Sequence, residues 1–85
     1  DNTPINKKII FKNPWDIPRK FFLSSSDESI MRVRSTTVEV APGGSAYLRL
    51  WFNSIPETQD AFLFLNDATT GQNEESFLFR VHVSR

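Results

Sequence analysis

His82 is the only histidine of the 85-residue chain, and the chain contains no cysteine. Because zinc sites in proteins are built mainly from Cys and His, a site at His82 would have to take its other ligands from carboxylates alone. A nucleophilic serine needs a base that a third group holds in place, and no serine here lies in a recognisable nucleophile turn. We therefore expect no enzymatic activity, no metal and no cofactor, and an ordinary surface histidine at position 82.

A second set of candidate ligands lies in one polar stretch near the C-terminus. Asp67, Glu74 and Glu75 supply carboxylates, and Asn66 and Asn73 lie beside them. Oxygen ligands on a flexible loop could hold calcium, but this spacing matches no known calcium loop. The alternative that we favour is a solvated hairpin tip, because Asn and Gly suit turn conformations.

A third set of residues suits recognition rather than catalysis. Tyr47, Arg49 and Trp51 alternate with apolar residues and so share one face of a predicted strand. Tyr, Arg and Trp are the residue types enriched in binding hot spots. We predict a partner-binding stripe of these three with Arg32 and Arg34, in which Trp51→Ala weakens binding without unfolding the domain. The alternative is that a neighbouring strand or the Pro14–Pro18 segment covers Trp51, or that the stripe packs on the stems of Arg32 and Arg34.

The elements that must position these residues are short strands. Period-two alternation or short apolar runs, bounded by turn signals such as Ala41–Gly44, recur along the chain, and no stretch has helical spacing. This pattern predicts an all-β fold, an immunoglobulin-like β-sandwich of about seven strands, in a single domain over residues 1–85. The predicted strands cover residues 5–12, 19–24, 30–34, 36–40, 45–52, 62–65 and 76–83.

Two packing predictions follow from the same pattern. On the last strand, Phe77, Phe79, Val81 and Val83 should face the core, opposite Arg80 and His82. At the first strand exit, Trp15 should plug the end of the sandwich, with its indole N–H bonded to the backbone.

Charge and composition exclude some classes of partner. The formal net charge is zero, so the whole chain carries no pull toward nucleic acid or an anionic membrane. The absence of cysteine favours a reducing compartment such as the cytoplasm, and neither a membrane-spanning run nor a signal peptide is evident. Because the first residue is Asp, we interpret the chain as a domain cut from a longer protein.

Several short pieces carry a family resemblance, which covers nearly the whole chain. In order, they are Lys12–Trp15, Val40–Gly44, Leu48–Phe52, Phe64–Asp67 and Asn73–Phe77. Together they resemble the immunoglobulin-like domains of the major sperm protein and ASH group, and most of all the C-terminal domains of nephrocystin-4. The resemblance implies a cysteine-free sandwich that acts as a non-catalytic scaffold in the cilium, basal body or centrosome. Its implied partners are other ciliary or nephrocystin-complex proteins and neighbouring domains of its own chain.

Two other function classes remain open. A basic N-terminal quarter, with Lys7, Lys8, Lys12, Arg19 and Lys20, could attract an acidic peptide. A peptide-binding adaptor of the sperm-protein type, which recognises acidic motifs that contain an aromatic residue, is therefore the second hypothesis. The third is a secreted adhesin or carbohydrate-binding sandwich, which would expose aromatic side chains on one face.

Overall fold

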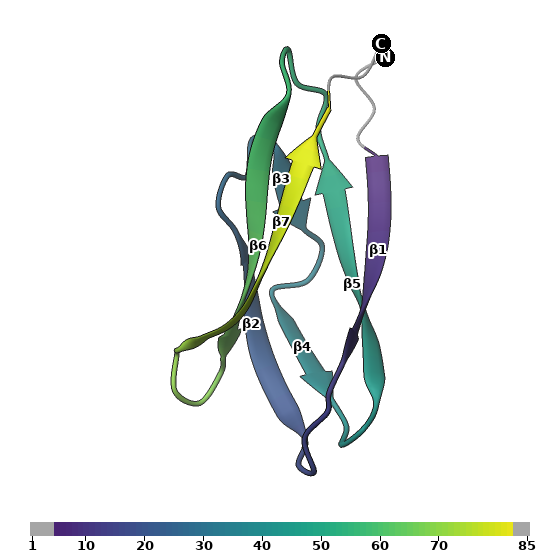
Figure 1. The fold of residues 1–85 in the computed structure, drawn as a ribbon, viewed down its shortest axis with the longest axis vertical. Helices are drawn as coiled ribbons and strands as arrows, with labels where there is room; N and C mark the ends of the chain where they lie inside the picture. Colours follow the sequence, from purple (N-terminus) through teal and green to yellow (C-terminus); the bar gives the residue numbers. More distant parts are fainter. Residues whose placement is uncertain (1–4, 83–85) are drawn as a thin grey trace.

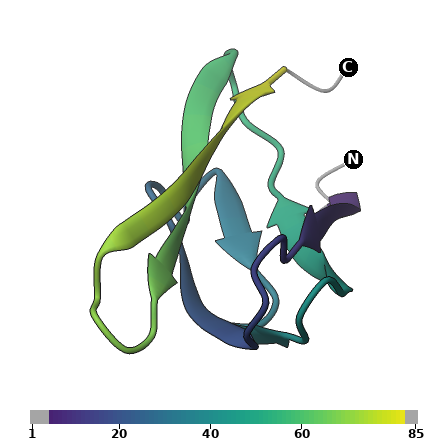
Figure 2. The same cartoon turned by 60° about the horizontal axis from the view of Figure 1, so that its bottom comes forward.

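The computed structural model describes residues 5–82, and over this range the chain forms two packed β-sheets (Figures 1 and 2). A three-stranded sheet has the order β1-β5-β3, and a four-stranded sheet has the order β4-β2-β6-β7. Every paired neighbour is antiparallel. The strands are β1 (Ile5–Lys12), β2 (Arg19–Ser25), β3 (Met31–Val33), β4 (Thr37–Val40), β5 (Ser45–Phe52), β6 (Gln59–Asp67) and β7 (Asn73–Val81). The expected all-β sandwich of about seven strands is confirmed.

Buried apolar residues alternate with outward-facing residues along the central strands of both sheets, and the buried ones form the core. Leu48 and Leu50 of β5 are buried against β2 and β6, which contribute Phe21, Leu63 and Leu65. Each large apolar side chain buried in this way contributes roughly 1.5–3 kcal/mol to folding. The intervening residues of each strand point outward, so the core pattern also fixes what both outer faces display.

The polar ends of the last hairpin are strand rather than loop, so the predicted loop over residues 66–75 was wrong. Pairing continues outward through Leu65 with Glu75 and Asn66 with Asn73, across a bulge after Leu65. Only residues 68–72 form the connection, and Gly71 there has a φ of 78°. The hairpin tip projects away from the body of the sandwich (Figures 1 and 2), which is why its strands carry polar residues.

On β7 the predicted faces agree with the structure as far as it describes them. Phe77 and Phe79 are partly buried against the core and Val81 is buried, while Arg80 is exposed. The expected position of Val83 lies outside the described residues. Between residues 5 and 82, no helix is long and apolar enough to cross a membrane.

Asn13, rather than Trp15, closes the end of the sandwich at the β1–β2 connection. Its side chain is fully buried, and Nδ2 donates to the carbonyls of Ile17 (2.8 Å) and Val40 (3.0 Å) and, at 3.2 Å, to a third on Ala41. Its Oδ1 accepts the Trp15 N–H at 2.8 Å. Trp15 itself is 37% exposed, so the prediction that it plugs the end of the sandwich was wrong. An amide can satisfy several converging backbone groups at once, whereas an indole can only donate one hydrogen bond.

Candidate protein-binding face

The five residues predicted to bind a partner lie on or beside one surface, the outer face of the β1-β5-β3 sheet. Trp51 lies directly opposite Arg32 on β3. Arg34 follows β3, and its N–H donates to the Arg49 carbonyl at 2.9 Å, which places Arg34 beside Arg49 of β5. Tyr47, Arg49, Arg32 and Arg34 are exposed, and Trp51 is half-buried. The structure thus brings the set together, while its binding role stays a prediction.

The sheet that carries this face is basic throughout. Strands β1, β3 and β5 contain no Asp or Glu, and they contain the cations Lys7, Lys8, Lys12, Arg32 and Arg49. All acidic residues within the described strands belong to the other sheet, on β4, β6 and β7. The charge balance of the chain therefore conceals a separation of charge between its two sheets.

Two cations on this face lie in direct opposition. Lys8 of β1 pairs with Arg49 of β5 across the ladder, and like charges at such positions destabilise a sheet. Among the described residues, neither takes part in an ion pair, and the same holds for Arg32 and Arg34. An acidic partner would relieve this repulsion.

Aromatic rings lie beneath two of these cations. The Lys8 ammonium lies 4.7 Å from the centroid of the Tyr47 ring, and the Arg32 guanidinium lies 5.3 Å from that of Trp51. Such contacts hold a cation over a flat apolar surface without neutralising it. Trp51 is thus half-buried, with the guanidinium of Arg32 over its ring, while Arg32 itself stays exposed.

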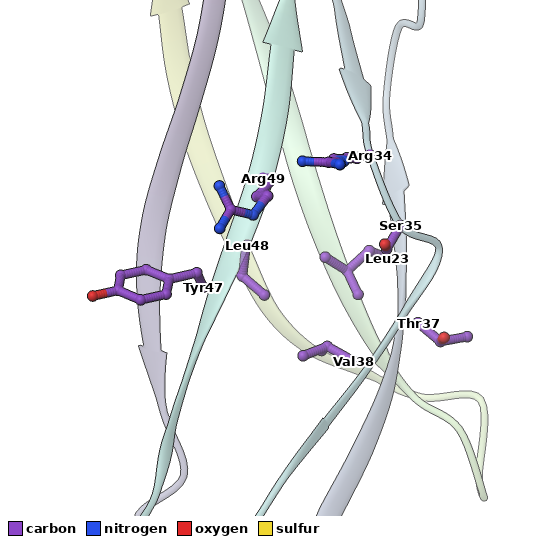
Figure 3. Close-up of a pocket in the computed structure, with 8 residues that line it drawn as sticks. All are labelled: Leu23, Arg34, Ser35, Thr37, Val38, Tyr47, Leu48 and Arg49. Carbon is purple, nitrogen blue, oxygen red and sulfur yellow. The ribbon is translucent and has the colours of Figure 1, made fainter.

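A hollow of about 430 Å³ opens beside the arginines, between β5 and the β3–β4 connection. Figure 3 shows the side chains of Arg34 and Arg49 extending toward the same side of the view, with Leu48, Leu23 and Val38 below them. A second hollow, of about 470 Å³, is lined by Leu50 and Trp51 among others and shares both arginines. Arg34 and Arg49 therefore line two concave sites, each of which also has apolar side chains in its lining.

The acidic hairpin residues serve a different purpose. Asp67 Oδ2 accepts from Arg19 at 2.7 Å, and Glu74 accepts from the same guanidinium at 2.6 Å. Asp67 Oδ1 accepts the N–H groups of Thr69 (2.7 Å) and Thr70 (2.9 Å). These bonds, that of Thr70 first and that of Arg19 next, lower the pKa of Asp67.

This use of Asp67 bears on the calcium alternative. Both of its carboxylate oxygens already accept hydrogen bonds within the hairpin and from β2. Across residues 5–82, no group of three or more His, Asp or Glu side chains is arranged to hold a metal ion. His82 is exposed just after β7.

The sequence interpretation missed an apolar surface on the opposite sheet. Phe22, Phe62 and Leu78 are 48%, 40% and 55% exposed, and the partly buried Phe64 stacks on Phe62. We call these four residues the Phe62 patch. Its signal was present: Phe62-Leu63-Phe64-Leu65 is apolar at every position, so one alternate pair must face outward from a strand.

Comparisons with known proteins agree with this fold. The family model described as NPH4 Ig-like domain 4 matches residues 2–84, nearly the whole chain. No curated protein matches the sequence closely enough to count as a relative.

Solved structures resemble the chain at low sequence identity. The Caenorhabditis elegans proteins SSP-19, an MSP-domain protein-like family member, and WR4, an MSP family member, have TM-scores of 0.71 and 0.69 and identities of 11% and 15%. Each alignment covers 98% of this chain, with 89% of SSP-19 and 87% of WR4. The Pseudomonas aeruginosa CupB2 chaperone has a TM-score of 0.73 at 13% identity, over 92% of this chain and 47% of the chaperone. These likenesses bear on the fold alone, and they confirm the immunoglobulin-like class.

Proposed function

Because the chain belongs to the family described as NPH4 Ig-like domain 4, we propose that it is a non-catalytic protein–protein interaction module. In this proposal, residues 1–85 form one domain of a longer scaffold protein of the ciliary transition zone or centrosome. The domain number in the family description supports a longer parent protein with several such domains. The resemblance of the Phe64–Asp67 and Asn73–Phe77 pieces to nephrocystin-4 supports the ciliary or centrosomal location. The location and the partners rest on family membership only.

One observation carries the choice of surface. The outer face of β1-β5-β3 holds four cations that no described acidic residue neutralises, two of them directly opposed as Lys8 and Arg49. Such a face attracts an acidic surface and disfavours a basic one, which is how charge sets specificity and association rate. The aromatic side chains of Tyr47 and Trp51 supply the apolar contact area that a hot spot needs.

The hollow beside Arg34 and Arg49 favours a second, narrower candidate. Its lining includes the apolar side chains of Leu23, Val38 and Leu48, and its border carries both guanidinium groups. A peptide with an aromatic residue next to carboxylates could place the ring in the hollow and the acids on the arginines. Recognition of acidic, aromatic-containing motifs is therefore the runner-up function.

Both candidates can be tested with a synthetic peptide of alternating Glu and Phe residues, titrated into the labelled chain. We expect Arg49→Gln and Arg34→Gln each to weaken binding about tenfold, as charge-assisted hydrogen bonds are worth roughly 1.5–3 kcal/mol. Trp51→Ala should weaken binding while leaving the circular dichroism spectrum unchanged. Lys20→Gln, which removes a cation from the other sheet, is the matched control and should bind as the unchanged chain does.

The outcomes separate the two candidates. Peptide binding that the arginine changes do not weaken would remove this face from the proposal. An absence of peptide binding would leave only folded acidic proteins as partners for the face. Proximity labelling with the full-length parent, repeated with Arg49 and Trp51 changed, tests the cellular part, and recovery of no transition-zone or centrosomal protein would contradict it.

A further inference from the structure

The Phe62 patch is the largest apolar feature on the outer surface of the four-stranded sheet. Phe62 lies directly opposite Leu78 on β7, and Phe22 of β2 is diagonal to Phe64. Three adjacent strands therefore contribute to one continuous surface. Contiguous exposed patches of this kind mark interaction sites in soluble proteins, whereas single exposed apolar residues do not.

The relief of the patch suits packing against another sheet. Phe62 and Phe64 form a stacked pair whose ring centroids are 5.9 Å apart, with planes only 7° from parallel. Ser24 and Ser76 lie opposite Phe64 on the two neighbouring strands. Phe64 therefore stands above small side chains on both sides, whereas Phe62 lies beside Leu78. An uneven surface of this kind can interdigitate when two sheets pack face to face.

The charges at the border of the Phe62 patch favour a second copy of this chain as its binding partner. At one end, Arg80 and Asp60 form an exposed ion pair with Nε and Oδ1 3.0 Å apart. At the other end, Lys20 lies opposite Glu39 in the β2–β4 register. Both ends thus carry one cation and one anion, so a second copy of the same face meets no net repulsion. The basic face of the other sheet, in contrast, repels its own copy.

The size of the face sets how strong such a contact can be. The four strands hold four, seven, nine and nine residues. At about 3.4 Å per residue and about 4.8 Å between strands, they offer a footprint of roughly 500 Å² per copy. Two copies together bury about 1,000 Å², near the lower limit for a specific interface. This area is consistent with a weak, reversible pair rather than an obligate dimer.

We propose that two copies of the domain associate symmetrically through the Phe62 patch, face to face across their four-stranded sheets. The pair is closed, since the same patch is used on both copies. It leaves the β1-β5-β3 faces outward on both sides, where each can meet a separate acidic partner. This self-association is independent of the proposed function, which uses the opposite sheet.

Sedimentation equilibrium of the purified chain from about 10 µM to 1 mM tests the proposal. We expect the average mass to rise with concentration and to level off at that of a dimer, with a dissociation constant in the micromolar to millimolar range. Leu78→Glu should raise that constant at least tenfold, because it places like charges in the centre of the paired patches. Phe22→Ser should raise it to a smaller extent.

The matched control is Ile10→Glu, which alters a residue that is 64% exposed on the other sheet and should not change dimerisation. A mass that stays monomeric at 1 mM would overturn the proposal. Growth beyond the dimer would also overturn it, since it would indicate an open contact between unlike faces. If Ile10→Glu weakens dimerisation and Leu78→Glu does not, the contact lies on the β1-β5-β3 sheet, which would also overturn the proposal. Circular dichroism confirms that each variant is folded.

Discussion

At the scale of single residues, Asn13 shows how a polar side chain can be essential to an apolar core. It is the fully buried amide that satisfies backbone groups converging from the β1–β2 connection and from the end of β4. Removing one partner of a buried hydrogen bond leaves the other without water or protein to bond. The stability of the whole domain is only about 4–13 kcal/mol at this length.

We therefore expect Asn13→Ala to lower the free energy of unfolding by about 2–4 kcal/mol, because one buried and three partly buried hydrogen bonds to the backbone are lost. Urea unfolding followed by tryptophan fluorescence measures the change. Asn53→Ala is the control: Asn53 donates one hydrogen bond to the Ser29 carbonyl in an exposed position, so its loss should cost under about 1 kcal/mol. Equal losses for the two variants would contradict this role for Asn13.

Asp67 makes stability depend on pH. Its folded-state pKa is lowered by the Thr70 N–H, by Arg19 and by the Thr69 N–H. A group with a lowered folded pKa contributes stability above its ordinary value, and this contribution is lost as the pH falls below that value toward the folded pKa. The ordinary value here is 3.8.

The unchanged chain should therefore lose more stability than Asp67→Asn when the pH is lowered from 5 to 3. Arg19→Gln should give an intermediate dependence, because the two threonine N–H groups remain. Urea midpoints at pH 7, 5, 4 and 3 provide the measurement. Parallel curves for the unchanged chain and Asp67→Asn would show that the carboxylate does not couple folding to protonation.

At the scale of elements, the β6–β7 hairpin depends on one residue with positive φ. Gly71 has a φ of 78°, and no atom lies within 4 Å of the place that a Cβ would occupy. A substitution there meets backbone strain rather than a clash. Gly71→Ala should therefore cost about 1–2 kcal/mol in unfolding free energy.

Gly71→Asn serves as the partner variant, since Asn tolerates the left-handed region better than Ala and should cost less. Urea unfolding of both variants measures the difference. If Ala is tolerated as well as Asn, the hairpin tip must adopt a different turn in solution.

How much of the molecule could be predicted also depends on the element. The ranges of β1 and β5 were predicted to the residue, because each alternates between a sheet face and the core. The hairpin ends were missed, since their pairing is made by backbone groups outside the core and leaves no hydrophobic period. The five-residue stripe was gathered correctly because β5 and β3 are neighbours, whereas Lys8 entered the site through a register that sequence does not specify.

At the scale of the whole molecule, the two outer faces differ in kind. One is cationic and aromatic, and the other is apolar with both charge signs at its border. Zero net charge excluded a strongly charged partner only for the chain taken as a whole. A thin sandwich brings each strand's outward residues to one of two surfaces, so its charge must be considered sheet by sheet.

The first and last strands also determine how the domain responds to tension. Ile5 at the start of β1 and Val81 at the end of β7 line the same hollow, at one end of the elongated molecule (Figure 1). In a longer chain that enters at β1 and leaves at β7, both connections would lie at this one end of the domain. Pulling on its two ends would peel β1 from β5 and β7 from β6 one hydrogen bond at a time, so the domain would yield at low force.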